Sequence, residues 1–158
     1  MKRRWTAGRP RPLLPAATAA VAAAVVCITV FMPWYTPDLA QPLAPDAVSG
    51  WDATAAARIA FAGAVLCLLC GLAIAMDARR MVALDDGGIA LLSIMAVVGA
   101  VVGVVAVGYR TAVVPEPSAE LSRQLGLYLA AIFALVALGA ALVQLLLSNS
   151  RPRLIRRG

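Results

Sequence analysis

The chain has 158 residues, of which 62% are hydrophobic and only 14% are charged, and its mean hydropathy is +0.86. Soluble domains contain roughly 45–50% apolar and about 25% charged residues, so this composition predicts a membrane protein. The net charge of +6 does not indicate a nucleic-acid-binding protein, because the bases lie at the two ends and in one short loop beside apolar segments.

The sequence has no histidine and three cysteines, and these lie inside apolar runs. This distribution excludes an external domain held together by disulfides, and it removes the commonest metal ligand and general base. Cys67 and Cys70 form a C-x-x-C pattern, but no further cysteine or histidine could complete a zinc site. We interpret them, like Cys27, as small packing residues and expect neither a metal nor a cofactor.

Residues 1–12 form a basic segment with one lysine, four arginines and no acid. We expect this arm to lie in the cytoplasm and to contact anionic lipid headgroups. The apolar run 13–32 has about the 20 residues that a helix needs to cross a bilayer, and Pro33 ends it. A basic arm before an apolar run is also typical of a signal peptide. This run is long for one and no clear cleavage site follows, so we favour an uncleaved anchor.

Three further apolar runs follow and predict transmembrane helices over 56–76, 88–108 and 125–147. Between 56–76 and 88–108, Asp85 and Asp86 precede two glycines and the third apolar run of the chain, which indicates a helix N-cap rather than a metal site.

The predicted fold is therefore an all-α membrane protein, a bundle of four antiparallel helices joined up-down-up-down. Its parts are the arm 1–12, a transmembrane domain 13–147 with outer loops 33–55 and 109–124, and a basic cytoplasmic tail 148–158.

The distribution of basic residues predicts the orientation of these helices across the membrane. If both termini lie in the cytoplasm, the inner segments hold eleven lysines and arginines, and the outer segments hold Arg58, Arg110 and Arg123. The positive-inside rule favours this arrangement. We therefore expect a multi-pass protein of the plasma membrane with both termini in the cytoplasm.

Small residues at helical spacing indicate where the helices pack, because lipid supplies no hydrophobic force between them. The candidate packing residues are Gly63, Cys67, Gly71, Gly99, Gly103 and Gly126. The same seams are candidates for contacts in a homo-oligomer.

The stretch 33–52, PWYTPDLAQPLAPDAVSGWD, combines aromatic residues, prolines and acids and has no base. Its aromatic residues either form an interfacial belt or fold inward into a cap over the helix ends. In the second case, arginines at the outer ends of the helices would pair with loop acids or stack on tryptophan. These arginines are Arg58, Arg110 and Arg123, and the acids are Asp38, Asp52, Glu116 and Glu120. The candidate residues are Trp34, Tyr35, Trp51, Asp52, Tyr109, Arg110, Arg123 and Tyr128.

The order of these pieces resembles a set of uncharacterised small four-span membrane proteins from high-GC bacteria. The similar features are PWY at 33–35, SGWDA at 49–53, Tyr109-Arg110, Arg123 and GLYLA at 126–130. The resemblance covers most of residues 13–147 and implies the four-span topology, without implying an activity.

No acid or base lies in the central part of any predicted span, and no set of residues specifies a reaction. We therefore predict a protein that is not an enzyme: an envelope accessory or scaffold subunit that recognises a protein partner or lipid through the 33–52 loop. The alternative is a small oligomeric permeation or carrier element for an apolar or neutral solute, with the glycine-rich third span lining the path.

Overall fold

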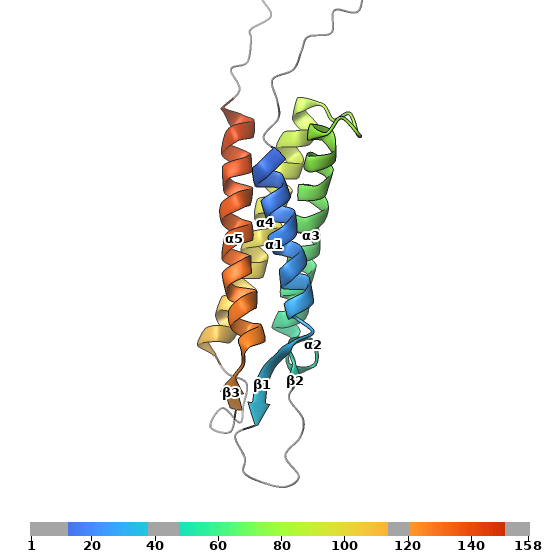
Figure 1. Ribbon diagram of the computed structural model, residues 1–158. Helices are drawn as coiled ribbons and strands as arrows, with labels where there is room; N and C mark the ends of the chain where they lie inside the picture. Colours follow the sequence, from blue (N-terminus) through green and yellow to red (C-terminus); the bar gives the residue numbers. More distant parts are fainter. Residues whose placement is uncertain (1–12, 38–47, 114–120, 151–158) are drawn as a thin grey trace, which may run out of the picture.

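The computed structural model describes residues 13–37, 48–113 and 121–150 of the chain. Its elements are, in order, α1 (Leu13–Thr29), β1 (Pro33–Pro37), β2 (Val48–Ser49), α2 (Gly50–Ala53), α3 (Ala55–Ala78), α4 (Asp86–Ala112), β3 (Leu121–Arg123) and α5 (Leu125–Asn149). The four long helices lie side by side, and α1 begins at the end of the bundle where α5 ends (Figure 1). The three strands lie together at the opposite end.

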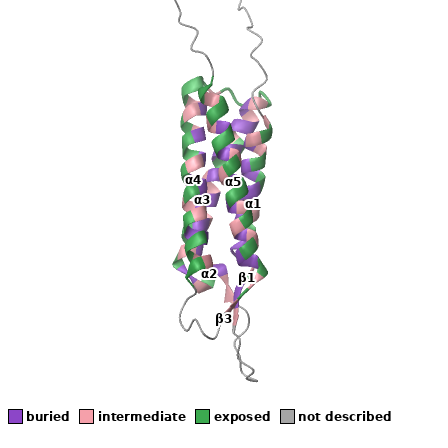
Figure 2. Ribbon diagram, turned by 90° about the vertical axis from the view of Figure 1, so that its left-hand side faces the viewer, coloured by how far each residue is buried: buried purple, intermediate pink, exposed green. Residues whose placement is uncertain are grey.

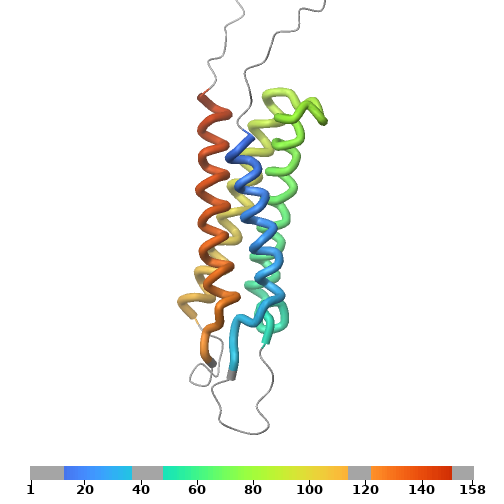
Figure 3. Tube along the Cα trace, in the orientation of Figure 1, coloured from blue at the N-terminus to red at the C-terminus, as the bar shows by residue number. Residues whose placement is uncertain are grey.

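Each long helix has two main neighbours. α1 packs against α3 and α5, and α4 packs against the same two helices. The chain runs up and down the bundle alternately (Figure 3). Buried residues face the interior, while exposed residues cover the outside along the whole length of the bundle (Figure 2). Large apolar side chains are among the exposed residues of every long helix, and such a surface suits a lipid environment.

The prediction of a mostly helical protein with apolar helices long enough to cross a membrane is confirmed. Within the described residues, α3, α4 and α5 reach that length, with 24, 27 and 25 residues. α1 has 17 residues and ends at Thr29, three residues before its predicted end. There the chain tightens into a turn, in which Phe31 N–H donates to the Ile28 carbonyl and Met32 N–H to the Thr29 carbonyl.

Beside the helices, the structure has a small antiparallel sheet with the strand order β2-β1-β3, which the sequence did not predict. Tyr35 pairs with Val48 on one side and with Arg123 on the other. Pro33 and Pro37 are the two ends of β1, which are the positions where a strand tolerates a residue without an N–H. The sheet therefore joins the end of α1 to the segments that precede α2 and α5.

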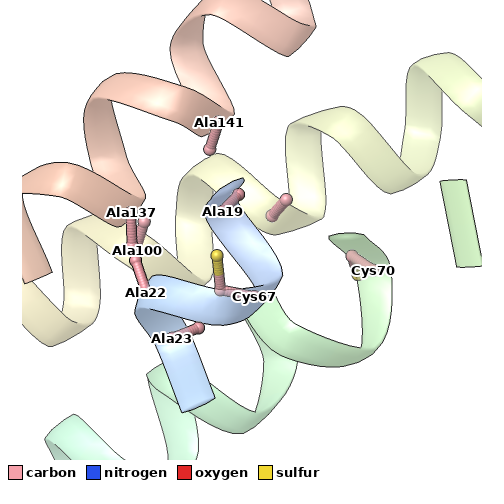
Figure 4. Packing of buried hydrophobic residues seen from close by; sticks show 9 residues of the cluster. Ala19, Ala22, Ala23, Cys67, Cys70, Ala100, Ala137 and Ala141 are labelled. Carbon is pink, nitrogen blue, oxygen red and sulfur yellow. The ribbon is translucent and has the colours of Figure 1, made fainter. Parts of the chain in front are cut away.

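The centre of the bundle is filled by small side chains from all four long helices (Figure 4). The buried members are Ala19, Ala22, Ala23, Cys67, Cys70, Ala96, Ala100, Ala137 and Ala141. Both cysteines are free thiols. Side chains of this size let the helix backbones approach closely, which favours association within lipid.

The connection between α3 and α4 is held by local hydrogen bonds. Arg80 adopts a left-handed conformation with φ 61°, and its N–H donates to the Asp77 carbonyl at 2.9 Å, which closes the end of α3. The Asp77 carboxylate accepts from Leu84 N–H at 2.9 Å. Asp85 is the N-cap of α4 and accepts from Gly88 N–H at 2.9 Å, as its sequence context predicts.

Candidate functional site

The strand end of the bundle holds most of the predicted recognition residues. β1 lies at its centre, between β2 and β3 (Figure 1). Thr36 and Ser122 face each other across β1 and β3, and their hydroxyl oxygens are 2.8 Å apart. The Gln124 amide also donates to the Thr36 hydroxyl. These polar contacts fix the position of β3 beside β1, and with it the start of α5.

Trp34 is completely buried at the strand end of the bundle, with none of its surface exposed. Its indole N–H donates to the Thr29 carbonyl at 2.8 Å, and its own carbonyl accepts from Gln124 N–H at 2.9 Å. The ring lies against two glycines. A Cβ on Gly50 would lie 2.5 Å from the ring, and one on Gly126 would lie 2.6 Å from the Pro33 carbonyl oxygen. Both positions therefore require glycine for the indole to be enclosed.

Tyr35 is also buried, with 1% of its surface exposed. Its hydroxyl donates to the Arg110 carbonyl at 3.3 Å, which links β1 to the last turns of α4. Arg123 is its partner across the sheet, so the two side chains leave the same face. Burial raises the pKa of Tyr35 above its ordinary value of 10.0, while the charges of Arg110 and Arg123 act in the opposite direction. The tyrosine is therefore neutral at physiological pH and lies close to two positive charges.

Arg110 and Arg123 provide the cationic part of the site. The Arg110 Nε is buried and has no hydrogen-bond partner among the described residues. Its guanidinium lies 5.4 Å from the centre of the Tyr109 ring, and Arg123 is exposed. Asp38, Glu116 and Glu120, which the sequence offers as partners for these arginines, lie outside the described residues. A carboxylate or phosphate is the group that would complete the hydrogen bonding of such a pair.

Trp51 lies with Phe31 and Phe61 in an aromatic group, here called the rim cluster, and Trp51 and Phe61 pack against the core residues that include Trp34 and Tyr35. The Trp51 ring stacks on Phe31, with centroids 5.4 Å apart, and meets Phe61 edge to face at 5.4 Å. Arg58 lies 5.6 Å from the Trp51 ring centre, and its Nε donates to the Trp51 carbonyl at 3.2 Å. Phe31 is 56% exposed. An exposed aromatic cluster with a cation suits the membrane–water interface.

The structure places the aromatic residues of the loop differently. Trp34 and Tyr35 are buried and Tyr35 lies close to Arg110 and Arg123, whereas Trp51 is only partly buried and lies in the rim cluster. Asp52 is exposed and accepts from the Ser49 hydroxyl rather than from an arginine. The remaining two candidates, Tyr109 and Tyr128, are 54% and 48% exposed.

The sequence did not point to Gly50 or to the polar contacts of Thr36, Ser122 and Gln124 as parts of this site. The available signal for Gly50 was a glycine directly before a tryptophan, in a loop that also had to accommodate a second tryptophan. Thr36 and Ser122 lie in short segments next to prolines or acids, so no periodicity marked them as strand residues.

All six candidate packing residues are buried in the bundle or at the strand end. A Cβ on Gly63 would lie 2.6 Å from the Gly99 carbonyl oxygen, and one on Gly99 would lie 2.6 Å from the Gly63 carbonyl oxygen. Gly71 approaches α1 in the same way, since its Cβ would lie 3.0 Å from the Ala16 carbonyl oxygen. The glycine face of α4 therefore packs against α3 inside one chain.

The described residues contain no group of three or more histidines, cysteines, aspartates or glutamates that could hold a metal ion. Comparisons of the chain with family models, with curated proteins and with solved structures found no match. The features of the molecule that bear on function are the chemistry of the strand end and the apolar surface of the bundle.

Proposed function

We propose that the protein is an integral membrane protein with four spans and both termini in the cytoplasm. In this proposal it is an accessory or scaffold subunit of a bacterial cell envelope, located in the plasma membrane, and acts by binding rather than by catalysis. The length and apolar surface of α3, α4 and α5 support the membrane location. α1 spans about 26 Å at 1.5 Å per residue, and the apolar residues 30–32 that follow it extend this length toward the roughly 30 Å of a hydrocarbon layer.

The orientation is supported by charge. The end of the bundle where α1 begins and α5 ends is joined to most of the bases, and the strand end holds Arg58, Arg110 and Arg123. The rim cluster of Phe31, Trp51 and Phe61 lies at the strand end, where the outer headgroups would be in this orientation.

Cysteines introduced one at a time at exposed positions test this topology. We expect Asp52→Cys and Ala112→Cys to react with a membrane-impermeant maleimide in intact cells, and Ala83→Cys and Ser150→Cys to react only after permeabilisation. The wild-type chain is the control for background labelling, because its three cysteines lie within helices. Labelling of Ala83→Cys and Ala112→Cys from the same side would refute a membrane-spanning α4.

The observation that supports the binding role is that two arginines lie close to the buried Tyr35 at the strand end. The Tyr35 hydroxyl donates to the Arg110 carbonyl, Arg123 is the residue paired with Tyr35 across the sheet, and the charges of both arginines act on Tyr35. The buried Arg110 Nε has no acceptor among the described residues. A partner with a carboxylate or phosphate group would supply one, and a preorganised site binds it with a smaller loss of conformational entropy.

A photoreactive residue at Tyr109 tests this recognition, because Tyr109 adjoins Arg110 and is 54% exposed, whereas Tyr35 is too buried to carry a probe. In native membranes we expect one defined protein to be captured. Its yield should fall roughly tenfold or more in an Arg110→Gln/Arg123→Gln variant, because a hydrogen bond to a charged group contributes about 1.5–3 kcal/mol.

Two matched variants serve as controls. A probe at Leu69, which is 59% exposed in the middle of α3, should capture lipid without the same protein. Arg79→Gln/Arg80→Gln removes two charges at the other end of the bundle and should leave the capture from Tyr109 unchanged. Recovery of lipid alone from Tyr109 would refute the scaffold role, and a yield independent of Arg110 and Arg123 would refute this site.

A further inference from the structure

An exposed cation lies on the rim cluster at the first turn of α3. The Arg58 guanidinium lies 5.6 Å from the Trp51 ring centre, and its Nε donates to the Trp51 carbonyl at 3.2 Å. Among the residues that the structure describes, the Arg58 side chain has no ion-pair partner. The nearby acid Asp52 accepts from the Ser49 hydroxyl at 2.7 Å instead. The positive charge of Arg58 is therefore not neutralised by this part of the chain.

The aromatic surface under Arg58 is held in place by the backbone and by the core. Trp51 N–H donates to the Val30 carbonyl at 2.9 Å, which joins α2 to the turn after α1. The Trp51 ring contacts Phe31 and Phe61, and Trp51 and Phe61 also pack against the buried core of the strand end. A guanidinium on an aromatic face keeps the N–H donors in its own plane available. The two Nη groups of Arg58 can therefore bind an anion while the cation stays on the ring.

Arg58 lies where the exposed surface of the bundle changes from polar to apolar. On the side of the strand end, Asp52 is exposed. On the side of the bundle, Ile28, Phe31 and Ile59 are 64%, 56% and 53% exposed. A cation on a tryptophan above an apolar surface is typical of the boundary between headgroups and hydrocarbon. In the orientation proposed above, this boundary belongs to the outer leaflet.

We propose that Arg58 binds the phosphate of an anionic phospholipid in the outer leaflet, whose acyl chains lie on the exposed apolar side chains beside it. The planar guanidinium matches the geometry of a phosphate and can donate two parallel hydrogen bonds to it. A zwitterionic lipid is a poorer occupant, because its headgroup carries a cation that the charge of Arg58 repels. The inference rests on the proposed membrane location but does not depend on the recognition site at Arg110 and Arg123.

The experiment places a photoreactive residue at Ile59 in the full-length protein, reconstituted into vesicles of equal parts phosphatidylglycerol and phosphatidylcholine. Mass spectrometry then measures the two lipids cross-linked at this position. We expect phosphatidylglycerol to exceed phosphatidylcholine roughly fivefold, the ratio that corresponds to about 1 kcal/mol for one base near an anionic surface. Arg58→Gln should bring the ratio to parity. Inorganic phosphate added in excess should leave the wild-type ratio unchanged.

The chain offers a control for the probe and one for the charge. Ile132 is 55% exposed on α5, which contains no base and lies across the bundle from α3, since both helices pack mainly against α1 and α4. A probe at Ile132 should therefore capture the two lipids equally. Arg79→Gln removes one charge at the other end of α3 and should leave the ratio at Ile59 unchanged. Circular dichroism checks that the variants keep the helical fold.

Four results would overturn the inference. They are equal capture of the two lipids at Ile59, a ratio that Arg58→Gln does not change, loss of the preference in excess inorganic phosphate, and capture of one defined protein in place of lipid. The two proposals fail separately. If the chain does not span the membrane, the cysteine labelling fails. If only the role of Arg58 is wrong, the labelling pattern persists while the probes at Ile59 and Ile132 capture the two lipids in the same ratio.

Discussion

Trp34→Ala is expected to destabilise the protein by about 3–5 kcal/mol, the usual cost of removing a fully buried large aromatic side chain. The indole is completely enclosed at the strand end and lies against Gly50 and Gly126. The loss should come mainly from packing, because the Thr29 carbonyl that accepts from the indole N–H also accepts from Met32 N–H. The measurement is the unfolding free energy in detergent micelles, followed by circular dichroism during denaturant titration.

Trp51→Ala is the matched control, because Trp51 is only partly buried and lies in the rim cluster. We expect Trp51→Ala to lower the unfolding free energy by about 1 kcal/mol, because it removes aromatic and cation contacts that are partly exposed. Equal destabilisation by the two variants would contradict the inward placement of Trp34.

The contact between Gly50 and the Trp34 ring provides a second test of this placement. Gly50→Ala should be costly in the wild type, where its Cβ would lie 2.5 Å from the indole ring, and much less costly in Trp34→Ala.

The sequence predicts the helices well because their signal is local. An apolar run of about 20 residues bounded by charges or prolines is sufficient to place a membrane helix, and α3, α4 and α5 begin and end within a few residues of their predicted bounds. The exception is the end of α1, where apolar residues continue past Thr29 although the backbone has already left the helix. Hydropathy does not distinguish an apolar turn from an apolar helix.

The sheet and the arrangement of the site depend on contacts between distant parts of the chain. β2 has two residues and β3 has three, too few for an alternating pattern to be recognised, and β1 is bounded by prolines. Trp34 and Trp51 both occur in the same loop next to an apolar run, so their local sequence does not show which of the two is fully buried. What separates them is the pair of glycines at 50 and 126 that closes around one indole.

The helix-packing glycines are a second case in which the local sequence does not distinguish residues that have different surroundings in the structure. This case can be tested by mutation. The sequence presents Gly99 and Gly103 as equivalent members of one GxxxG pattern. The structure distinguishes them. A Cβ on Gly99 would lie 2.6 Å from the Gly63 carbonyl oxygen and 3.0 Å from the Cys67 nitrogen, whereas one on Gly103 would meet only the Ala60 carbonyl oxygen, at 4.0 Å.

We therefore expect Gly99→Ala to destabilise the bundle by about 1–3 kcal/mol, the usual cost of overpacking. The obstructing atoms are backbone atoms of α3, so they can move only if the two helices separate. Gly63→Ala should have a similar effect, because its Cβ would meet the Gly99 carbonyl oxygen at the same distance. Separation of the helices should also expose Cys67, which is fully buried, and its alkylation rate in micelles should rise in both variants.

Gly103→Ala is the control that decides between sequence pattern and structure. Its added methyl group has room, and alanine is favoured over glycine in a helix by about 0.8–1.0 kcal/mol, so this variant should be as stable as the wild type or slightly more stable. Gly108→Ala, with no atom near its added Cβ, should behave in the same way. If Gly103→Ala were as destabilising as Gly99→Ala, α4 would approach α3 along the whole GxxxG pattern. The close contact between these helices would then not be confined to Gly63 and Gly99.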